Sequence, residues 1–246
     1  MRWIYLSPHF DDAVLSCGGL IWEQTHSGIA VEIWTLCAGN PPPGPISEFA
    51  EGIHKMWKTG TAQETVELRR IEDQNAGRRV GALVQHLNIP DAIYRRSETT
   101  GPYYPESVFV EPNPREPGVA DEILRQFSAK ITQYDTLVCP LAAGGHVDHR
   151  LTRAAAEQLN RPLWYYADIP YTLNEPDTLA PAVDNMTSRT FFISAKGLHA
   201  WQDSIAAHNS QLSSLFGDEE SMRQKIKEYA QGRGGLPLWE RELIVE

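Results

Sequence analysis

Two clusters of histidine and aspartate are the residues of this chain that are best placed to do chemistry. The first cluster consists of His9, Asp11 and Asp12, and the second of His146, Asp148 and His149. Imidazole nitrogens and carboxylate oxygens are ligands of catalytic zinc, where three protein ligands leave one position open for water. Adjacent buried carboxylates are also costly unless a cation compensates their charge. The two clusters together therefore predict one composite metal site.

The spacing within the first cluster predicts different roles for its members. His9 and Asp12 lie three residues apart and can converge on one ion from a turn, and Asp11 then faces a bound water. In the alternative interpretation, Asp12 and Asp148 only cap the helices that begin beside them. That alternative leaves His9 and Asp11 without a task, so we favour the metal.

Both clusters hold the same position relative to the expected secondary structure. Each follows an apolar, strand-like run, at residues 3–6 and at 136–139, and each precedes a helix-like stretch. Open α/β sheets bind their ligands at the carboxyl ends of the strands. We therefore expect the two loops to meet at one edge of a sheet.

Strand-like and helix-like stretches also alternate along the rest of the chain. Further strands are expected at residues 29–36 and 163–167, and helices at 61–83 and 119–132. Apolar residues recur every three or four positions over 198–215, which indicates one helix face. The alternation predicts an α/β, Rossmann-like fold, in which a mostly parallel sheet carries helices on both faces in three layers. We expect a single domain over residues 1–246.

The composition argues against several classes of function. The chain has 22 lysines and arginines against 32 aspartates and glutamates, so its formal charge is 22 − 32 = −10. This balance disfavours binding to nucleic acids or to anionic membranes. No apolar segment approaches the roughly 20 residues that span a bilayer, and no GxGxxG motif follows an expected strand. Three scattered cysteines and the lack of a recognisable signal peptide lead us to expect a cytoplasmic protein.

Four motifs occur in a characteristic order. PHFDDA stands at residues 8–13, RRIE at 69–72, HVDH at 146–149, and a stretch that ends in HNSQ at 196–211. They are similar to the (A/P)HPDDE, RxxE, HxDH and KxxA…HxSQ motifs of one family. From residue 4 to about residue 215, the chain thus resembles the LmbE/PIG-L-type zinc-dependent de-N-acetylases.

The resemblance implies hydrolysis of an N-acyl group, most simply acetyl, from an amino-sugar-like small molecule or glycoconjugate. A metal-bound water would attack the amide carbonyl, with Asp11 as general base. His146 would stabilise the oxyanion or protonate the leaving amine, with Asp148 orienting it. The implied ion is Zn²⁺, with Fe²⁺ as an alternative, and its implied ligands are His9, Asp12 and His149.

Candidate substrate contacts follow with less support. Arg69 matches the arginine that the family uses to contact substrate, and its alternative is a surface arginine that pairs with Glu72 or Asp73. Asp168 follows an expected strand and is a candidate contact, with an ordinary loop residue as its alternative, and Asp91 is another candidate.

Loops at residues 41–56 and 98–118 are expected to set specificity. Trp57, Tyr103 and Tyr104 could stack on a sugar there, although packing within the loops is the commoner use of such side chains. His208 is as readily a hydrogen-bonded core histidine as a site residue.

Two positions depart from the family pattern. Phe10 replaces the usual proline, which we expect to change only the stiffness of the turn, and Ala13 replaces the usual glutamate. A metal- or sugar-binding module that has lost catalysis is therefore one alternative, although the retained Asp11 argues against it. A non-haem Fe(II) oxygenase is another, because His146 and Asp148 form an HxD element, but such triads usually lie on all-β barrels. The expected partner is the small sugar substrate, and a homo-oligomer is compatible with the sequence.

Overall fold

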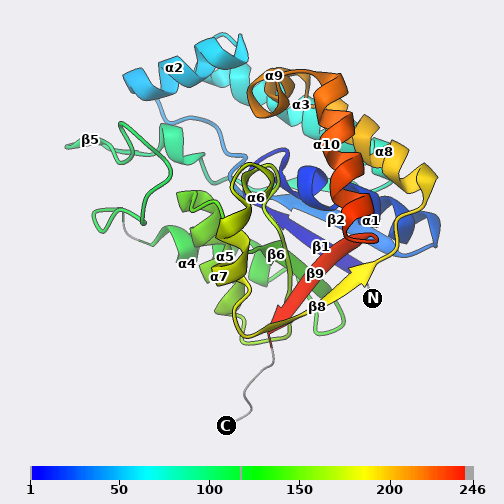
Figure 1. Cartoon of the computed structure of the whole chain (residues 1–246). Helices are drawn as coiled ribbons and strands as arrows, with labels where there is room; N and C mark the ends of the chain where they lie inside the picture. The colour runs from blue at the N-terminus through cyan, green and yellow to red at the C-terminus, as the bar shows by residue number, and fades with distance from the viewer. Residues whose placement is uncertain (1, 117, 242–246) are drawn as a thin grey trace.

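The computed structural model describes residues 2–116 and 118–241, and a seven-stranded sheet lies at its centre (Figure 1). The strands, in spatial order, are β3 (Leu83–His86), β2 (Ala30–Thr35), β1 (Arg2–Ser7), β6 (Thr136–Pro140), β7 (Trp164–Tyr166), β9 (Leu236–Arg241) and β8 (Met186–Phe191). The first five are parallel to one another, and β9 is antiparallel to both of its neighbours. The predicted mostly parallel α/β sheet is confirmed.

Helices cover both faces of the sheet. The longer ones are α1 (Asp12–His26), α2 (Glu48–Trp57), α3 (Ala62–Val80), α4 (Val119–Ser128), α5 (Val147–Glu157), α8 (Ala195–Ala206), α9 (Asn209–Phe216) and α10 (Glu219–Gly232). Short elements complete the fold: α6 (Tyr171–Asn174), α7 (Leu179–Ala182), the 3₁₀ turns η1 (Ala92–Tyr94) and η2 (Pro176–Thr178), and the small pair β4 (Arg96–Ser97) and β5 (Gly101–Pro102). No helix in the described part of the chain combines the length and the apolar character needed to cross a membrane.

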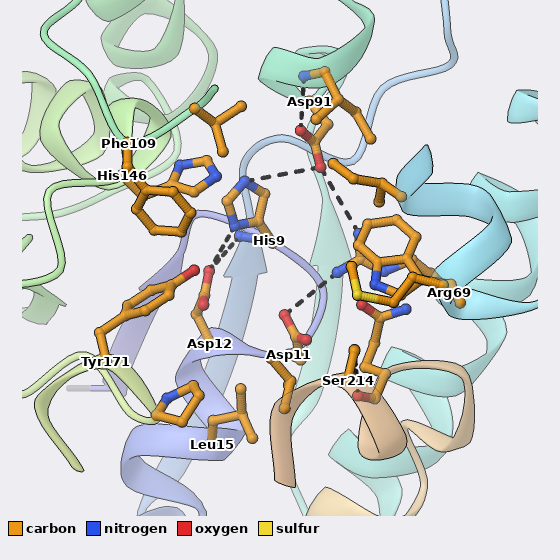
Figure 2. Close-up of a pocket in the computed structure, with 18 of the residues that line it drawn as sticks. His9, Asp11, Asp12, Leu15, Arg69, Asp91, Phe109, His146, Tyr171 and Ser214 are labelled. Carbon is orange, nitrogen blue, oxygen red and sulfur yellow. Dashed lines mark hydrogen bonds and ion pairs between the residues drawn. The ribbon is translucent and has the colours of Figure 1, made fainter. Parts of the chain in front are cut away.

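The carboxyl ends of β1 and β6 bring the two polar clusters together. The two strands are direct neighbours in the sheet, so the loops that follow them open on the same edge (Figure 2). The first loop runs directly into α1 and the second into α5. This adjacency confirms the expectation that the two clusters meet.

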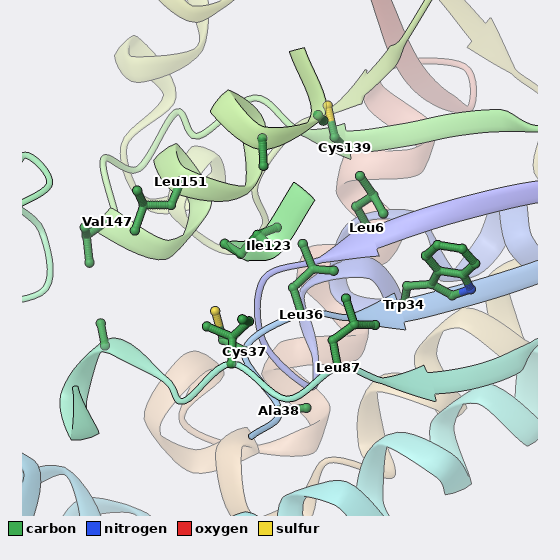
Figure 3. Packing of buried hydrophobic residues seen from close by; sticks show 14 of the residues in the cluster. Leu6, Trp34, Leu36, Cys37, Ala38, Leu87, Ile123, Cys139, Val147 and Leu151 are labelled. Carbon is green, nitrogen blue, oxygen red and sulfur yellow. The ribbon is translucent and has the colours of Figure 1, made fainter. Parts of the chain in front are cut away.

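The sheet packs apolar side chains into a core on each face. Leu6 of β1 and Leu36 beyond β2 face Ile123 of α4 and Leu151 of α5 (Figure 3). Tyr5 belongs to the opposite core, which lies beneath α1. Because helices cover both faces, the central strands are nearly continuous apolar runs. The core thus holds the strand ends, and the loops on them, in fixed positions.

Three expected elements end or begin elsewhere in the structure. The helix expected over 119–132 ends at Ser128. The helix expected over 61–83 ends at Val80, because Gly81 adopts a left-handed conformation (φ 74°) and Leu83 already begins β3. The expected loop at 41–56 contains α2 instead, which begins where Ser47 accepts a hydrogen bond from the Ala50 amide. This helix becomes one wall of the site described below.

The single helix face expected over 198–215 is wrong. The segment forms two helices, α8 and α9, with His208 between them. Glu72 of α3 accepts hydrogen bonds from both the amide and the hydroxyl of Ser210, which starts a new helix at that point. The apolar spacing continues across the break, so it did not reveal the change of direction.

Strands β8 and β9 were not predicted. Most of β8 is exposed at the edge of the sheet, and its sequence is polar. Its partner β9 contains Pro237, which cannot donate to a ladder and weakens a strand assignment.

Candidate metal centre and substrate pocket

Three possible ligand atoms meet where the two loops face each other. Asp12 Oδ2 lies 3.1 Å from His9 Nδ1 and 3.2 Å from His149 Nε2. His146 is adjacent, since ligand atoms of His9, His146 and His149 all lie within 4.8 Å of one another. All four side chains are buried. The structure therefore places the three predicted metal ligands around one point.

Each of the two histidines predicted to bind the metal has a second carboxylate partner. His149 Nδ1 lies 2.6 Å from Asp168 Oδ1, and His9 Nε2 lies 3.1 Å from Asp148 Oδ2. A carboxylate accepts, so each of these two nitrogens carries a proton, and the opposite ring nitrogens point towards Asp12. Metal-binding histidines typically use such a carboxylate to fix their orientation.

The surroundings of one atom, Nε2 of His149, indicate whether a cation fits between these residues. The buried Nε2 of His149 has no hydrogen-bond partner, although Asp12 Oδ2 is near it. An unpartnered ring nitrogen, a second imidazole nitrogen and a carboxylate oxygen are a donor set that suits Zn²⁺ and Fe²⁺. The residues present therefore fit a divalent cation.

Neither Asp12 nor Asp148 caps a helix through its side chain. At the start of α1, Asp11 is the N-cap residue but forms no side-chain cap, and Asp12 Oδ2 accepts instead from the His9 amide. At the start of α5, the cap is His146, whose Nδ1 accepts from the Asp148 amide. The alternative in which Asp12 and Asp148 serve only as caps is thus wrong.

The Asp148 carboxylate forms no hydrogen bond with His146, contrary to the expectation that it orients that ring. It receives hydrogen bonds from the Ala92 amide (2.9 Å) and from Arg95 (2.5 Å), and it faces His9. Burial alone would raise the pKa of Asp148, but Arg95 and His9 hold it below its ordinary value. The ionised carboxylate therefore positions His9, and only the backbone amide of Asp148 orients His146.

A chain of polar contacts connects this carboxylate to the loop at residues 98–118. Arg95 also pairs with Glu116, at 2.6 Å from Nε to Oε1, and Tyr104 donates its hydroxyl to the other oxygen of Glu116. Tyr104 is therefore buried and occupied within the loop, and it does not line the pocket. The loop thus contacts a ligand histidine through two intermediates, Arg95 and Asp148.

Asp168 is not a substrate contact, which corrects the prediction. It is 1% exposed, and both of its oxygens are occupied, one by His149 and the other by the Ala143 amide at 3.0 Å. It does not line the pocket. Its position at a strand end suits a residue that orients a metal ligand.

Arg69 reaches the site from α3 and is buried, so the surface ion pair with Glu72 or Asp73 is wrong. Its guanidinium lies 3.4 Å from Asp11 and 3.7 Å from Asp91. The same group stacks between Trp57 and Phe10, with its carbon 4.6 and 5.3 Å from the two ring centroids. Phe10 therefore does more than stiffen the turn, because it supports the arginine beside Asp11.

The charges around the cluster set the protonation of its histidines. Burial opposes the charged form of His149, but Asp12 and Asp168 outweigh it and raise its pKa to about 9. Burial lowers the pKa of His146 well below its ordinary value, and the neighbouring His9 and His149 add to that effect. His146 is consequently neutral, and because its Nδ1 accepts from a backbone amide, its Nε2 carries the proton.

A pocket of about 280 Å³ opens above these residues. Its floor consists of His9, Asp11, Asp12, Arg69, Asp91 and His146. The predicted catalytic and substrate residues Asp11, His146 and Arg69 therefore lie together, and the further candidate Asp91 joins them. Trp57 also lines the pocket, whereas Tyr103 and His208 do not.

The two segments expected to set specificity, at residues 41–56 and 98–118, both line the pocket, but their individual wall residues and the helix α2 could not be identified from the sequence. Phe49, Ile53 and Met56 come from the unpredicted α2, and Tyr171 comes from α6. Gly144 was the available signal for Tyr171, since a Cβ at this position would lie 2.4 Å from the tyrosine ring. His208 is buried and does not line the pocket, but it is not the hydrogen-bonded core histidine of the first alternative, because neither of its ring nitrogens has a hydrogen-bond partner.

The sequence of this chain is similar to one protein family and to a curated deacetylase. Residues 4–160 match the model of the PIG-L family, GlcNAc-PI de-N-acetylase. A 2'-N-acetylparomamine deacetylase from Niallia circulans is 29% identical over 233 residues, which cover 88% of this chain and 82% of that protein.

Solved structures of two deacetylases share the fold. The zinc-inhibited form of teicoplanin deacetylase superposes with a TM-score of 0.81 at 25% identity, over 98% of this chain and 97% of the other. The A40926 pseudoaglycone deacetylase gives a TM-score of 0.79 at 26% identity, over 100% and 99% of the two chains.

Proposed function

The chain belongs to the PIG-L family of GlcNAc-PI de-N-acetylases, and from that membership we propose that it hydrolyses the N-acetyl group of an amino sugar or amino-sugar glycoconjugate, with zinc as its cofactor. The observation that carries the proposal is the convergence of His9 Nδ1, Asp12 Oδ2 and His149 Nε2 beneath a pocket that also holds Asp11. The named relatives act on N-acetylated paromamine and on teicoplanin, which supports a glycosidic substrate here.

Hydrolysis of an amide needs an activated water, an electrophile for the carbonyl oxygen and a proton for the amine. Held by His9, Asp12 and His149, a divalent cation would polarise the carbonyl and make a water more acidic. Asp11 is the neighbouring carboxylate that does not face the ligand atoms, and Arg69 holds it in place. It accepts the proton from the attacking water and returns it to the nitrogen as the C–N bond breaks, which gives acetate and the free amine.

His146 supplies the remaining polar contact. It is neutral and protonated on Nε2, so it donates a hydrogen bond to the carbonyl oxygen as negative charge develops there. Between the two roles considered for this histidine, the geometry favours stabilisation of the oxyanion over protonation of the amine.

The alternatives receive less support. The sheet of this chain is not the all-β barrel that usually carries Fe(II) oxygenase triads. A binding module without catalysis has no use for Asp11, which lies unligated in the pocket beside Arg69.

The test is release of free amine from N-acetylglucosamine and its simple glycosides by the zinc-loaded protein. We expect release that a chelator abolishes and that added Zn²⁺ restores. If no amine appears from any N-acetylated sugar while metal analysis shows full occupancy, the deacetylase proposal is wrong. Consumption of O₂ with 2-oxoglutarate would instead support the oxygenase.

A further inference from the structure

The upper part of the pocket is apolar on two sides. From α2 come Phe49, Ile53 and Met56, and from the loop at residues 98–118 come Val108 and Phe109. Met56 and Phe109 remain 53% and 54% exposed. Exposed apolar side chains that gather around a binding site indicate that a ligand covers them.

Aromatic contacts hold the loop side of this wall in place. The Phe109 ring packs edge-on against His146 and Tyr171, with centroid distances of 5.4 and 5.5 Å. Phe109 and Tyr171 stand across the ligand residues from Arg69 (Figure 2). A substrate whose acetyl group reaches the floor must therefore extend between apolar walls.

The charged groups of the pocket are already paired with one another, and the remaining polar side chains that line it, Tyr171, Gln211 and Ser214, carry no charge. Its carboxylates are Asp11, Asp12 and Asp91, and each faces Arg69 or a ligand histidine. Among the described lining residues, no further carboxylate stands ready for a substrate ammonium group. The walls thus do not match an aminoglycoside that carries several positive charges.

We propose that the substrate is an N-acetylated amino sugar whose aglycone is apolar, an aryl or alkyl group that lies between α2 and Phe109. The inference rests on the proposed deacetylase function and narrows its substrate class. The proposal excludes a polycationic substrate for this chain. An ammonium group beside an apolar wall would lose its hydration, and the walls of this pocket offer no group that compensates the loss.

The test compares kcat/KM for methyl, phenyl and octyl N-acetylglucosaminides and for 2'-N-acetylparomamine. We expect the phenyl and octyl glycosides to exceed the methyl glycoside about tenfold or more, mainly through a lower KM, and the paromamine derivative to be the poorest substrate. Equal values for the three glycosides, or a preference for the paromamine derivative, would overturn the proposal.

A pair of variants locates the effect. Met56→Gln keeps the length of the side chain but makes the wall polar, and we expect the octyl-to-methyl ratio of kcat/KM to fall by about fivefold. Ile71→Gln is the matched control, because Ile71 is 57% exposed on a helix and does not line the pocket. An unchanged ratio in Met56→Gln, or the same fall in Ile71→Gln, would show that the wall does not bind the aglycone.

Failure of the deacetylase proposal can be distinguished from failure of the proposed substrate class. If no glycoside releases amine, calorimetric binding of octyl and methyl N-acetylglucosaminide still decides whether the apolar walls select the aglycone. Tighter binding of the octyl compound, weakened by Met56→Gln, supports the substrate class, and equal binding refutes it.

Discussion

Replacing Asp168 by asparagine tests how the site is organised, because two interpretations of this residue predict different measurements. The structure places Asp168 Oδ1 2.6 Å from His149 Nδ1, whereas position in the sequence alone favoured a substrate contact. In Asp168→Asn the amide oxygen still accepts a hydrogen bond, but the negative charge beside the ligand histidine is lost.

The magnitude follows from this contact. A hydrogen bond to a charged group is worth about 1.5–3 kcal/mol and a neutral one about 0.5–1.5 kcal/mol. Losing the charge but keeping the bond therefore costs about 1–1.5 kcal/mol, which corresponds to about a 5- to 10-fold change in affinity, at the lower end of what a changed partner behind a metal ligand typically causes. We therefore expect Asp168→Asn to bind Zn²⁺ about 5- to 10-fold more weakly, with a nearly unchanged KM once the site is saturated with metal.

Zinc affinity is measured by competition with a chromogenic chelator, and KM at saturating zinc. Asp203→Asn is the control, because Asp203 pairs with Arg223 on α10, outside the described pocket. A variant with wild-type zinc affinity and a raised KM would refute the positioning role and restore the substrate contact.

Three further changes have defined outcomes. Asp11→Asn should retain zinc and lose about 10²-fold or more in kcat, as removal of a general base predicts; a near wild-type kcat would make Asp11 structural. The pKa of His149 is about 9 against 6.5 in the unfolded chain, so its proton stabilises the metal-free fold below pH 6.5, and this stabilisation is lost as the pH rises through about 9. A cation must displace this proton and one on His9, where burial opposes the charged form but Asp91 and Asp12 raise the pKa well above its ordinary value, so zinc affinity measured with metal buffers should rise at least about tenfold per pH unit from pH 7 to 9, and a flat profile would contradict the assignment. Ala13 is fully buried in the apolar core beneath α1, so Ala13→Glu should lower the free energy of unfolding in urea by at least about 2 kcal/mol, and an unchanged midpoint would show that the glutamate reaches the metal centre instead.

The convergence of His9, Asp12 and His149 could be predicted from the sequence because it depends on short-range rules. His9 and Asp12 share one loop, His149 lies in another, and parallel strands present such loops at one edge of the sheet. The roles of Asp148 and Asp168 could not be predicted in the same way. Each depends on which side chain lies across a gap in space, and a strand-end aspartate has the same sequence context whether it meets substrate or a histidine.

The walls of the pocket were harder to predict for a related reason. Helix α2 follows a proline-rich stretch, and its apolar residues face the pocket and the loop beside it instead of the sheet. The break at His208 is imposed by Glu72, which lies 138 residues before Ser210 in the chain. Local periodicity carries no information about such distant contacts.

The contacts from Glu116 through Arg95 to Asp148 bear on how this enzyme can be re-engineered. A designer who seeks a new substrate range would exchange the segment at residues 98–118, since it carries Phe109. That exchange also removes the glutamate that pairs with Arg95, and it leaves the arginine free to turn away from Asp148. A transplanted segment must therefore contain an acceptor for Arg95. Without one, the variant with the new specificity will bind the metal more weakly.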